Sequence, residues 1–120
     1  MALAIAVETN QDYMVQILLE AGASANVDLD GTPILNIAVQ NDLEGIVRHL
    51  VEAGGNVHVE CNGSLLLNIA TLNQNKEIVE ILLKAGVDAN KTSDKGRFFS
   101  PALHIAITAK DQSIVELLLK

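Results

Sequence analysis

A four-residue segment recurs along the chain at nearly constant spacing, and no other feature limits the fold as strongly. The copies begin at Leu3, Leu35, Leu67 and Leu103, and they read Leu-Ala-Ile-Ala, Leu-Asn-Ile-Ala twice, and Leu-His-Ile-Ala. Their spacings are 32, 32 and 36 residues, and an Ala-Gly pair at 21–22, 53–54 and 85–86 keeps the same phase. Two sequence segments that recur with the same spacing predict stacked structural repeats that bury apolar surface against their neighbours.

Each unit contains two apolar runs with the period of a helix. In the second run of the third unit, Ile78, Val79, Leu82 and Leu83 stand at i, i+1, i+4 and i+5 and so form one helical face. A Gly follows this run in the first three units and suits the left-handed residue that ends a helix. The first run is shorter, and the predicted N-caps of the second helix are Asn10, Asp42, Asn75 and Asp111.

These motifs resemble the ankyrin repeat family. The family's Thr-Pro-Leu-His, Glu-Ile-Val-x-Leu-Leu-Leu and Gly-Ala-Asp-Val-Asn segments correspond to residues 32–36, 77–83 and 86–90. The resemblance implies an all-α solenoid, a single domain over 1–120 with four stacked helix-turn-helix repeats and projecting hairpin-like loops. The expected repeats are 1–30, 31–62, 63–98 and 99–120, of which the first and last are incomplete.

Several positions depart from the family pattern. One extra residue lies between Pro33 and Leu35, and Asn36 and Asn68 replace the usual His. Gly45 stands where the family has Glu, and it is expected to weaken its helix by roughly 1 kcal/mol relative to Ala. The usual turn Gly is replaced at four positions: Asn10, Asp42, Gln74 and Lys110. None of these changes interrupts the helical pattern.

Charge and cysteine content limit the classes of partner and the cellular compartment that the chain is expected to have. Fifteen acidic and eight basic residues leave a net charge of −7, which disfavours nucleic acid and anionic membranes as partners. Cys61 is the only cysteine, so no internal disulfide can form, and a reducing cytoplasmic setting, with the nucleus as an alternative, is expected. Both ends of the chain are as apolar as its interior. We therefore expect flanking repeats of a longer array.

The sequence contains no recognisable catalytic group of residues. The three histidines, His49, His58 and His104, are interpreted as structural or surface residues, and the resemblance implies that His104 hydrogen-bonds neighbouring loops. No Cys-x-x-Cys or His-x-x-x-His spacing occurs, and no Gly-rich phosphate loop is present. The chain is therefore predicted not to be an enzyme and to need neither a cofactor nor a metal.

The resemblance implies that first helices and loops line a concave side that binds a partner protein. In this sequence, the predicted partner-binding residues are Leu29, Asp30, Gln40, Asn41, Leu72, Asn73, Arg97, Phe98 and Phe99. The apolar members of this set are the first candidates, because grouped water-facing apolar side chains can mark an interface. An interaction scaffold is expected, and the alternative is a regulatory segment of a larger enzyme or channel that docks within its own chain.

The loop before the fourth unit carries two further hypotheses. The 36-residue spacing adds four residues there, and the only two Phe residues, Phe98 and Phe99, are adjacent in it. At least one ring is predicted to be exposed and to anchor a partner, while the alternative is that one ring packs on the fourth repeat. The segment from Leu82 to Asn90 also resembles the loop that asparaginyl hydroxylases modify, which makes Asn90 a candidate modification site.

Overall fold

In the residues that the structure describes, eight helices form four stacked pairs, as the repeat pattern predicted. A computed structural model describes residues 2–58, 60–61, 64–87 and 101–119. The first helices of the pairs are α1 (Ala2–Glu8), α3 (Ile34–Gln40), α5 (Leu66–Leu72) and α7 (Pro101–Thr108). The second helices are α2 (Asp12–Glu20), α4 (Glu44–Glu52), α6 (Lys76–Lys84) and α8 (Gln112–Leu119). The predicted all-α repeat solenoid is confirmed.

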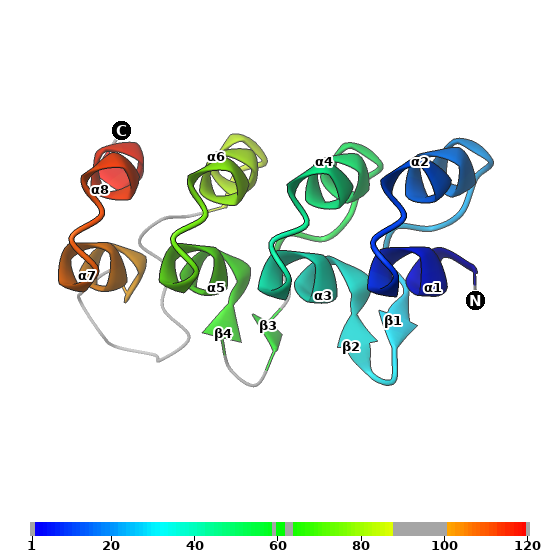
Figure 1. The fold of residues 1–120 in the computed structure, drawn as a ribbon, viewed down its shortest axis with the longest axis horizontal. Coiled ribbons are helices and arrows are strands. Elements are labelled where there is room, and N and C mark those ends of the chain that lie inside the picture. The colour runs from blue at the N-terminus through cyan, green and yellow to red at the C-terminus, as the bar shows by residue number, and fades with distance from the viewer. Residues whose placement is uncertain (1, 59, 62–63, 88–100, 120) are drawn as a thin grey trace.

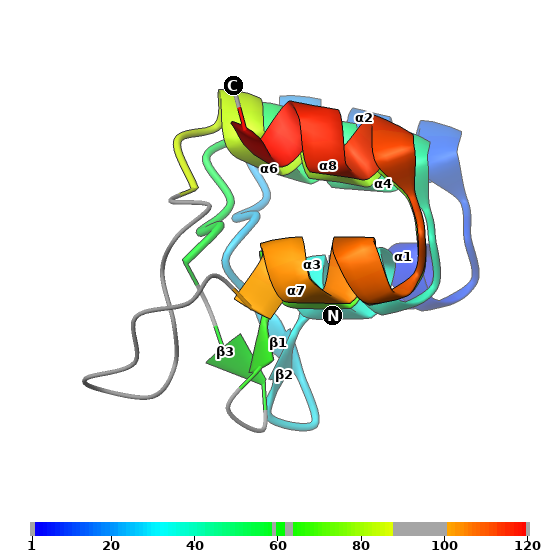
Figure 2. The same ribbon diagram turned by 90° about the vertical axis from the view of Figure 1, so that its left-hand side faces the viewer.

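The helices form two layers. The four first helices lie in one row and the four second helices in the other, and each helix contacts its counterpart in the next pair (Figure 1). The stack measures 41 × 27 × 21 Å along its principal axes. Figure 2 looks along the stack and shows the two layers with the hairpin loops projecting beyond the first-helix layer. Each helix pair lies inside one of the four expected repeat segments.

Among the described connections between repeats, two are short antiparallel hairpins. Strand β1 (Asp28–Leu29) pairs with β2 (Thr32–Pro33), and β3 (Glu60–Cys61) pairs with β4 (Ser64–Leu65). The loop of the first hairpin is Asp30-Gly31, with φ values of 51° and 82°. Positive φ at both central residues is what a two-residue hairpin turn matching the strand twist requires.

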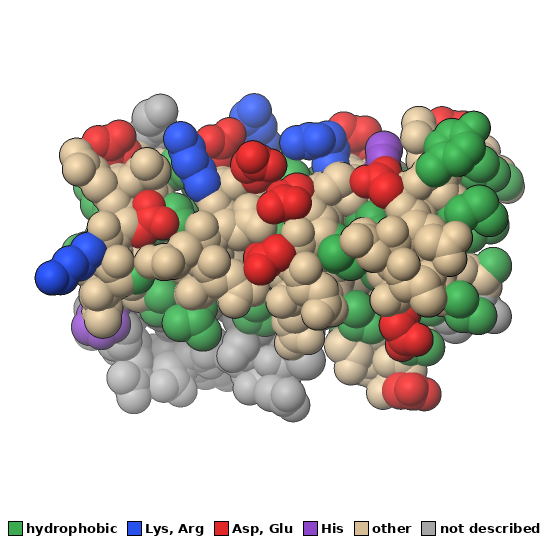
Figure 3. Space-filling model, in the orientation of Figure 1, with side chains coloured by type: hydrophobic (Ala, Val, Ile, Leu, Met, Phe, Trp, Pro, Cys, Tyr) green, Lys and Arg blue, Asp and Glu red, His purple; other side chains and the backbone are tan. Residues whose placement is uncertain are grey.

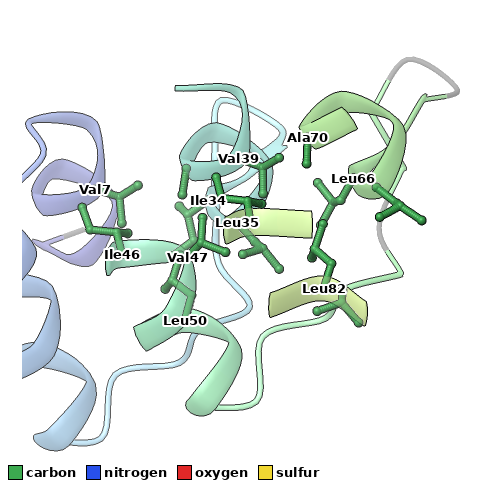
Figure 4. Packing of buried hydrophobic residues seen from close by; sticks show 14 of the residues in the cluster. Val7, Ile34, Leu35, Val39, Ile46, Val47, Leu50, Leu66, Ala70 and Leu82 are labelled. Atoms are coloured by element: carbon green, nitrogen blue, oxygen red, sulfur yellow. The ribbon is translucent and has the colours of Figure 1, made fainter. Parts of the chain in front are cut away.

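The apolar core runs continuously between the two helix layers. Figure 4 shows that second-repeat side chains such as Leu35, Val47 and Leu50 point into it. Figure 4 draws Val7 of α1 next to Ile46 of α4, and both residues belong to the one core cluster that the first and second repeats share. Both side chains are fully buried or nearly so. Among the described residues, the buried apolar side chains are all Leu, Ile, Val or Ala.

The predicted N-caps are right in two repeats and wrong by one residue in the other two. Asn75 Oδ1 accepts a hydrogen bond from the Ile78 amide, and Asp111 Oδ1 accepts one from the Ile114 amide, both at 3.1 Å. Asn10 and Asp42 instead have left-handed φ values of 55° and 58°, as the turn requires. Asn and Asp suit both a cap and a left-handed turn position, so the sequence did not distinguish the two roles.

The second helices of the first two repeats are joined by a side-chain hydrogen bond. His49 Nε2 lies 2.8 Å from Asp12 Oδ1. A Cβ atom at Gly45 would overlap the Asp12 carboxylate, so the missing side chain at position 45 makes room for this contact. Gly45 is expected to weaken its helix, and its missing side chain also allows the contact between Asp12 and His49.

A double-mutant cycle measures how the effect of Gly45→Ala on stability depends on Asp12. In an Asp12→Ala background, Gly45→Ala should raise the free energy of unfolding by about 0.5 to 1 kcal/mol, because Ala is the better helix former. In the parent chain the gain should be smaller, since the new methyl group displaces Asp12 from His49. Urea unfolding of the four variants gives both differences. Equal gains in the two backgrounds would show that the steric conflict carries no weight.

Candidate functional site

The C-terminal ends of the first helices present one row of exposed side chains. The row, called the helix-end row below, consists of Glu8, Gln40, Leu72 and Thr108, which occupy the same position in the four repeats. All four side chains are exposed. Leu72 is the apolar member, with 69% of its surface accessible, between polar counterparts in the adjoining repeats.

Asparagine side chains hold the backbone next to this row. Asn41 Nδ2 donates a hydrogen bond to the Ile37 carbonyl in its own helix at 2.9 Å. Asn73 Nδ2 donates to the Gln40 carbonyl at 3.3 Å and so ties the third repeat to the second. The Asn73 bond gives a partner to a carbonyl group at the helix C-terminus, whereas the Ile37 carbonyl also accepts from the Asn41 backbone amide at 3.1 Å. Asn41 and Asn73 therefore position the helix-end row as well as bordering it.

The hairpin candidates lie at the opposite end of the first helix. Leu29 and Asp30 precede α3, whereas Gln40 ends it, and seven helical residues span roughly 10 Å. Asp30 is exposed at the hairpin turn, but Leu29 is half-buried and packs against the core. The structure thus brings Gln40, Asn41 and the Leu72-Asn73 pair together and places the hairpin residues apart from them.

Three predicted partner-binding residues, Arg97, Phe98 and Phe99, lie outside the described residues. The same is true of Asn90, the candidate hydroxylation site.

Acidic groups border the helix-end row. Figure 3 views the face that carries the turns between paired helices, and Asp and Glu side chains are scattered across it. Asn75 Nδ2 donates to Asp42 Oδ1 at 3.1 Å and to Glu44 Oε1 at 2.9 Å, which holds two of these carboxylates next to the third repeat. Carboxylates near one another attract a cationic partner group more strongly than a single one does.

The histidines occupy the structural or surface positions expected of them. His49 contacts Asp12, and His58 and His104 are exposed. Within the part of the chain that the structure describes, no group of three or more His, Cys, Asp and Glu side chains is arranged to hold a metal ion. None of the described helices is long and apolar enough to cross a bilayer.

One buried polar side chain was not recognised from the sequence as a special site. Asn36 is fully buried in α3, and neither its Nδ2 nor its Oδ1 has a hydrogen-bond partner among the described residues. The replacement of the family's His at this position was the signal that could have drawn attention to it. Its location inside the helix layers separates it from the exposed helix-end row.

Comparison with known protein families gives one match. The model of the family described as ankyrin repeats (3 copies) matches residues 35–120, which include nearly all of the second helix pair and both of the following pairs. No curated protein sequence gives a significant match to the chain.

Proposed function

The chain belongs to the ankyrin repeat family, and from this premise we propose that it binds a partner protein through the helix-end row and its flanking asparagines. Ankyrin repeats are generally protein-protein interaction modules. The proposed contact residues in the described part of the chain are Gln40, Asn41, Leu72 and Asn73, and Leu29 and Asp30 are proposed as a separate contact at the hairpin before α3.

The observation that carries this proposal is the exposure of Leu72. Its counterparts Glu8, Gln40 and Thr108 are polar, so repeat stacking does not call for an apolar residue at this position. Burying an exposed Leu side chain against a partner contributes about 1.5 to 3 kcal/mol of favourable free energy. Leu72 is therefore proposed as the apolar anchor of the interface.

The surroundings of Leu72 favour one kind of partner. The chain carries a net charge of −7, and the Asp42 and Glu44 carboxylates lie within reach of Asn75, three residues beyond Leu72. Opposite charge on the partner would speed association and fix its orientation. We infer a protein segment that presents an apolar side chain flanked by Lys or Arg.

Replacing Leu72 by Asp tests the proposal. Partner proteins captured by the parent chain from a reducing cell extract should bind Leu72→Asp more weakly by roughly 1 to 3 kcal/mol, because the anchor is lost and a charge is introduced. Titration of each captured partner by calorimetry measures the difference. The unfolding midpoint should hardly change, since Leu72 is exposed.

Tyr13→Asp is the matched control. Tyr13 is also an exposed apolar position, 72% accessible, but it lies on α2 in the other helix layer. This variant should bind the captured partners as the parent does. Equal affinity of Leu72→Asp and Tyr13→Asp would place the binding surface elsewhere.

From the same family membership we propose three further properties of the chain. The chain acts as a non-catalytic module, which is typical of the family. It works in a reducing compartment, since Cys61 is its only cysteine. Phe98 and Phe99 extend the binding surface from the loop before the fourth repeat.

A further inference from the structure

The helix-end row repeats at a nearly constant step along the stack. Its four members have the same register in the four repeats, and the first helices that carry them follow one another along the longest axis of the molecule (Figure 1). That axis measures 41 Å and holds the four described helix pairs, so that one pair occupies about 10 Å, a typical distance between packed helices. A partner segment that contacts several members of the row must therefore offer a contact group at this step.

The exposure of this row is a property of each repeat. Gln40 and Leu72 belong to the second and third repeats, which have described helix pairs on both sides, and both side chains are exposed all the same. Each is the last residue of its helix, α3 or α5. Neighbouring repeats therefore leave this position open to a partner along the whole row.

Two regular backbone conformations return to the same face at the step of the row. A polyproline II segment rises about 3.1 Å per residue with three residues per turn, so every third residue faces the same side at intervals of about 9 Å. An α-helix rises about 1.5 Å per residue, so its residues i and i+7 lie on one face about 10.5 Å apart. A β-strand does not fit, because residues three apart, which span about 10 Å, point to opposite faces.

Two asparagine side chains beside the row favour the polyproline II conformation. Asn41 and Asn73 have the same register in adjacent repeats, and each uses Nδ2 to donate to a backbone carbonyl group. Among the described residues, no group donates to the Oδ1 atom of either side chain. Each Oδ1 is thus an open acceptor. A polyproline II segment leaves its backbone N–H groups unpaired and can donate them, whereas a helix uses most of its own N–H groups internally.

The charges along the row determine the order of side chains that a partner should present. Leu72 in the third repeat offers an apolar contact. In the second repeat, the exposed Asp42 carboxylate follows Gln40 in the turn at the end of α3. In the first repeat, the exposed member of the row is Glu8. Lys or Arg side chains of a partner would meet opposite charge in both of these repeats.

We propose that the partner segment binds along the helix-end row in a polyproline II conformation, with one turn of three residues over each repeat. This inference rests on the proposed function, since it uses the same row and the same Leu72 anchor. The segment carries an apolar residue over Leu72, a Lys or Arg three residues away beside Asp42, and a second Lys or Arg six residues away beside Glu8. Its backbone N–H groups donate to the Oδ1 atoms of Asn41 and Asn73.

Peptides of one composition test the three-residue step. The matched probe carries one Leu and two Lys residues at intervals of three, separated by Ala and Pro, and it is made in both chain directions. Two isomers place the same residues at intervals of two and of four. In fluorescence anisotropy, the matched probe in one of its directions should bind the chain more tightly than either isomer, by roughly tenfold or more. A helical peptide with the same three residues at intervals of seven should bind no better than the isomers.

A charge swap at Glu8 tests the register of the bound segment. Glu8→Lys should weaken binding of the matched probe by roughly two- to fivefold, the size expected of an exposed charge pair. A probe with Glu in place of the Lys farthest from Leu should recover this loss, and the same replacement at the middle Lys should recover less. Glu20→Lys is the control, because it makes the same change of charge at an exposed position on α2 in the other helix layer. It should leave the affinity nearly unchanged.

The Leu72→Asp variant separates this proposal from the proposed function. It should weaken binding of the matched probe by roughly tenfold or more. If all isomers bind the parent chain equally and Leu72→Asp weakens each of them, Leu72 is an anchor but the three-residue step is wrong. Tightest binding of the helical peptide would overturn the polyproline II conformation. Equal affinity of Leu72→Asp and the parent for the matched probe would overturn both proposals, and a folded parent chain that does not bind the matched probe at millimolar concentration would overturn this one.

Discussion

Leu50→Ala should lower the free energy of unfolding by about 2 to 5 kcal/mol. Leu50 is fully buried in α4, and both neighbouring repeats contribute to the core around it. Truncation removes the contacts of the isobutyl group and leaves a cavity that close-packed helices fill only in part. Since small domains have net stabilities of about 5 to 15 kcal/mol, this loss is a large fraction of the total.

The repeat register supplies a control for this prediction. Leu118 stands at the position of Leu50 in the fourth repeat and is only half-buried. Leu118→Ala should therefore cost about 1 kcal/mol. Urea unfolding followed by circular dichroism measures both values. Equal losses would mean that burial between two repeats does not determine the stability of a layer.

Asn36→Leu should raise the free energy of unfolding by about 1 to 3 kcal/mol. The Asn36 amide is fully buried with no hydrogen-bond partner among the described residues, and an unsatisfied buried polar group carries a desolvation cost of this size. Leu branches at Cγ as Asn does, and its bulkier methyl groups replace the polar Oδ1 and Nδ2 atoms, which removes that cost. Thermal and urea unfolding should both shift in the stabilising direction.

Asn68→Leu is the matched control, because Asn68 has the same register in the third repeat and is half-buried. Water reaches a half-buried amide more easily, so its replacement should change stability by less than about 0.5 kcal/mol. A loss of stability in Asn36→Leu would contradict the prediction and would mean that the Asn36 amide has a polar partner or that the larger Leu side chain overpacks the site.

The helix pattern could be predicted from the sequence because it depends on local periodicity. Apolar residues at helical spacing, Gly after the second helix and turn residues between helices act within a few positions of one another. The Gly22, Gly54 and Gly86 residues indeed have φ values of 101°, 91° and 96°. The one-residue errors at Asn10 and Asp42 arose where one residue type suits two adjacent positions.

The candidate site was predicted less completely. The exposure of Leu72 follows from the position of that residue at the end of a short helix, which the register fixes. Half-burial of Leu29 did not follow, because it depends on how the hairpin packs against the core rather than on its place in the loop. For the same reason the separation of the hairpin residues from the helix-end row required the structure.

The sequence by itself determined the repeat period, the helix pairs and the face that each helix buries, since these properties depend on residues close together in the chain. Only the tertiary structure decided which residues at the same repeat position are exposed and which are buried. Met14 and Ile46, or Ile107 and Val7, are equivalent in sequence register, yet one of each pair is exposed and the other is buried. The physical reason is that burial at these positions comes from the adjacent repeat, about 32 residues away, and not from the helix to which the residue belongs.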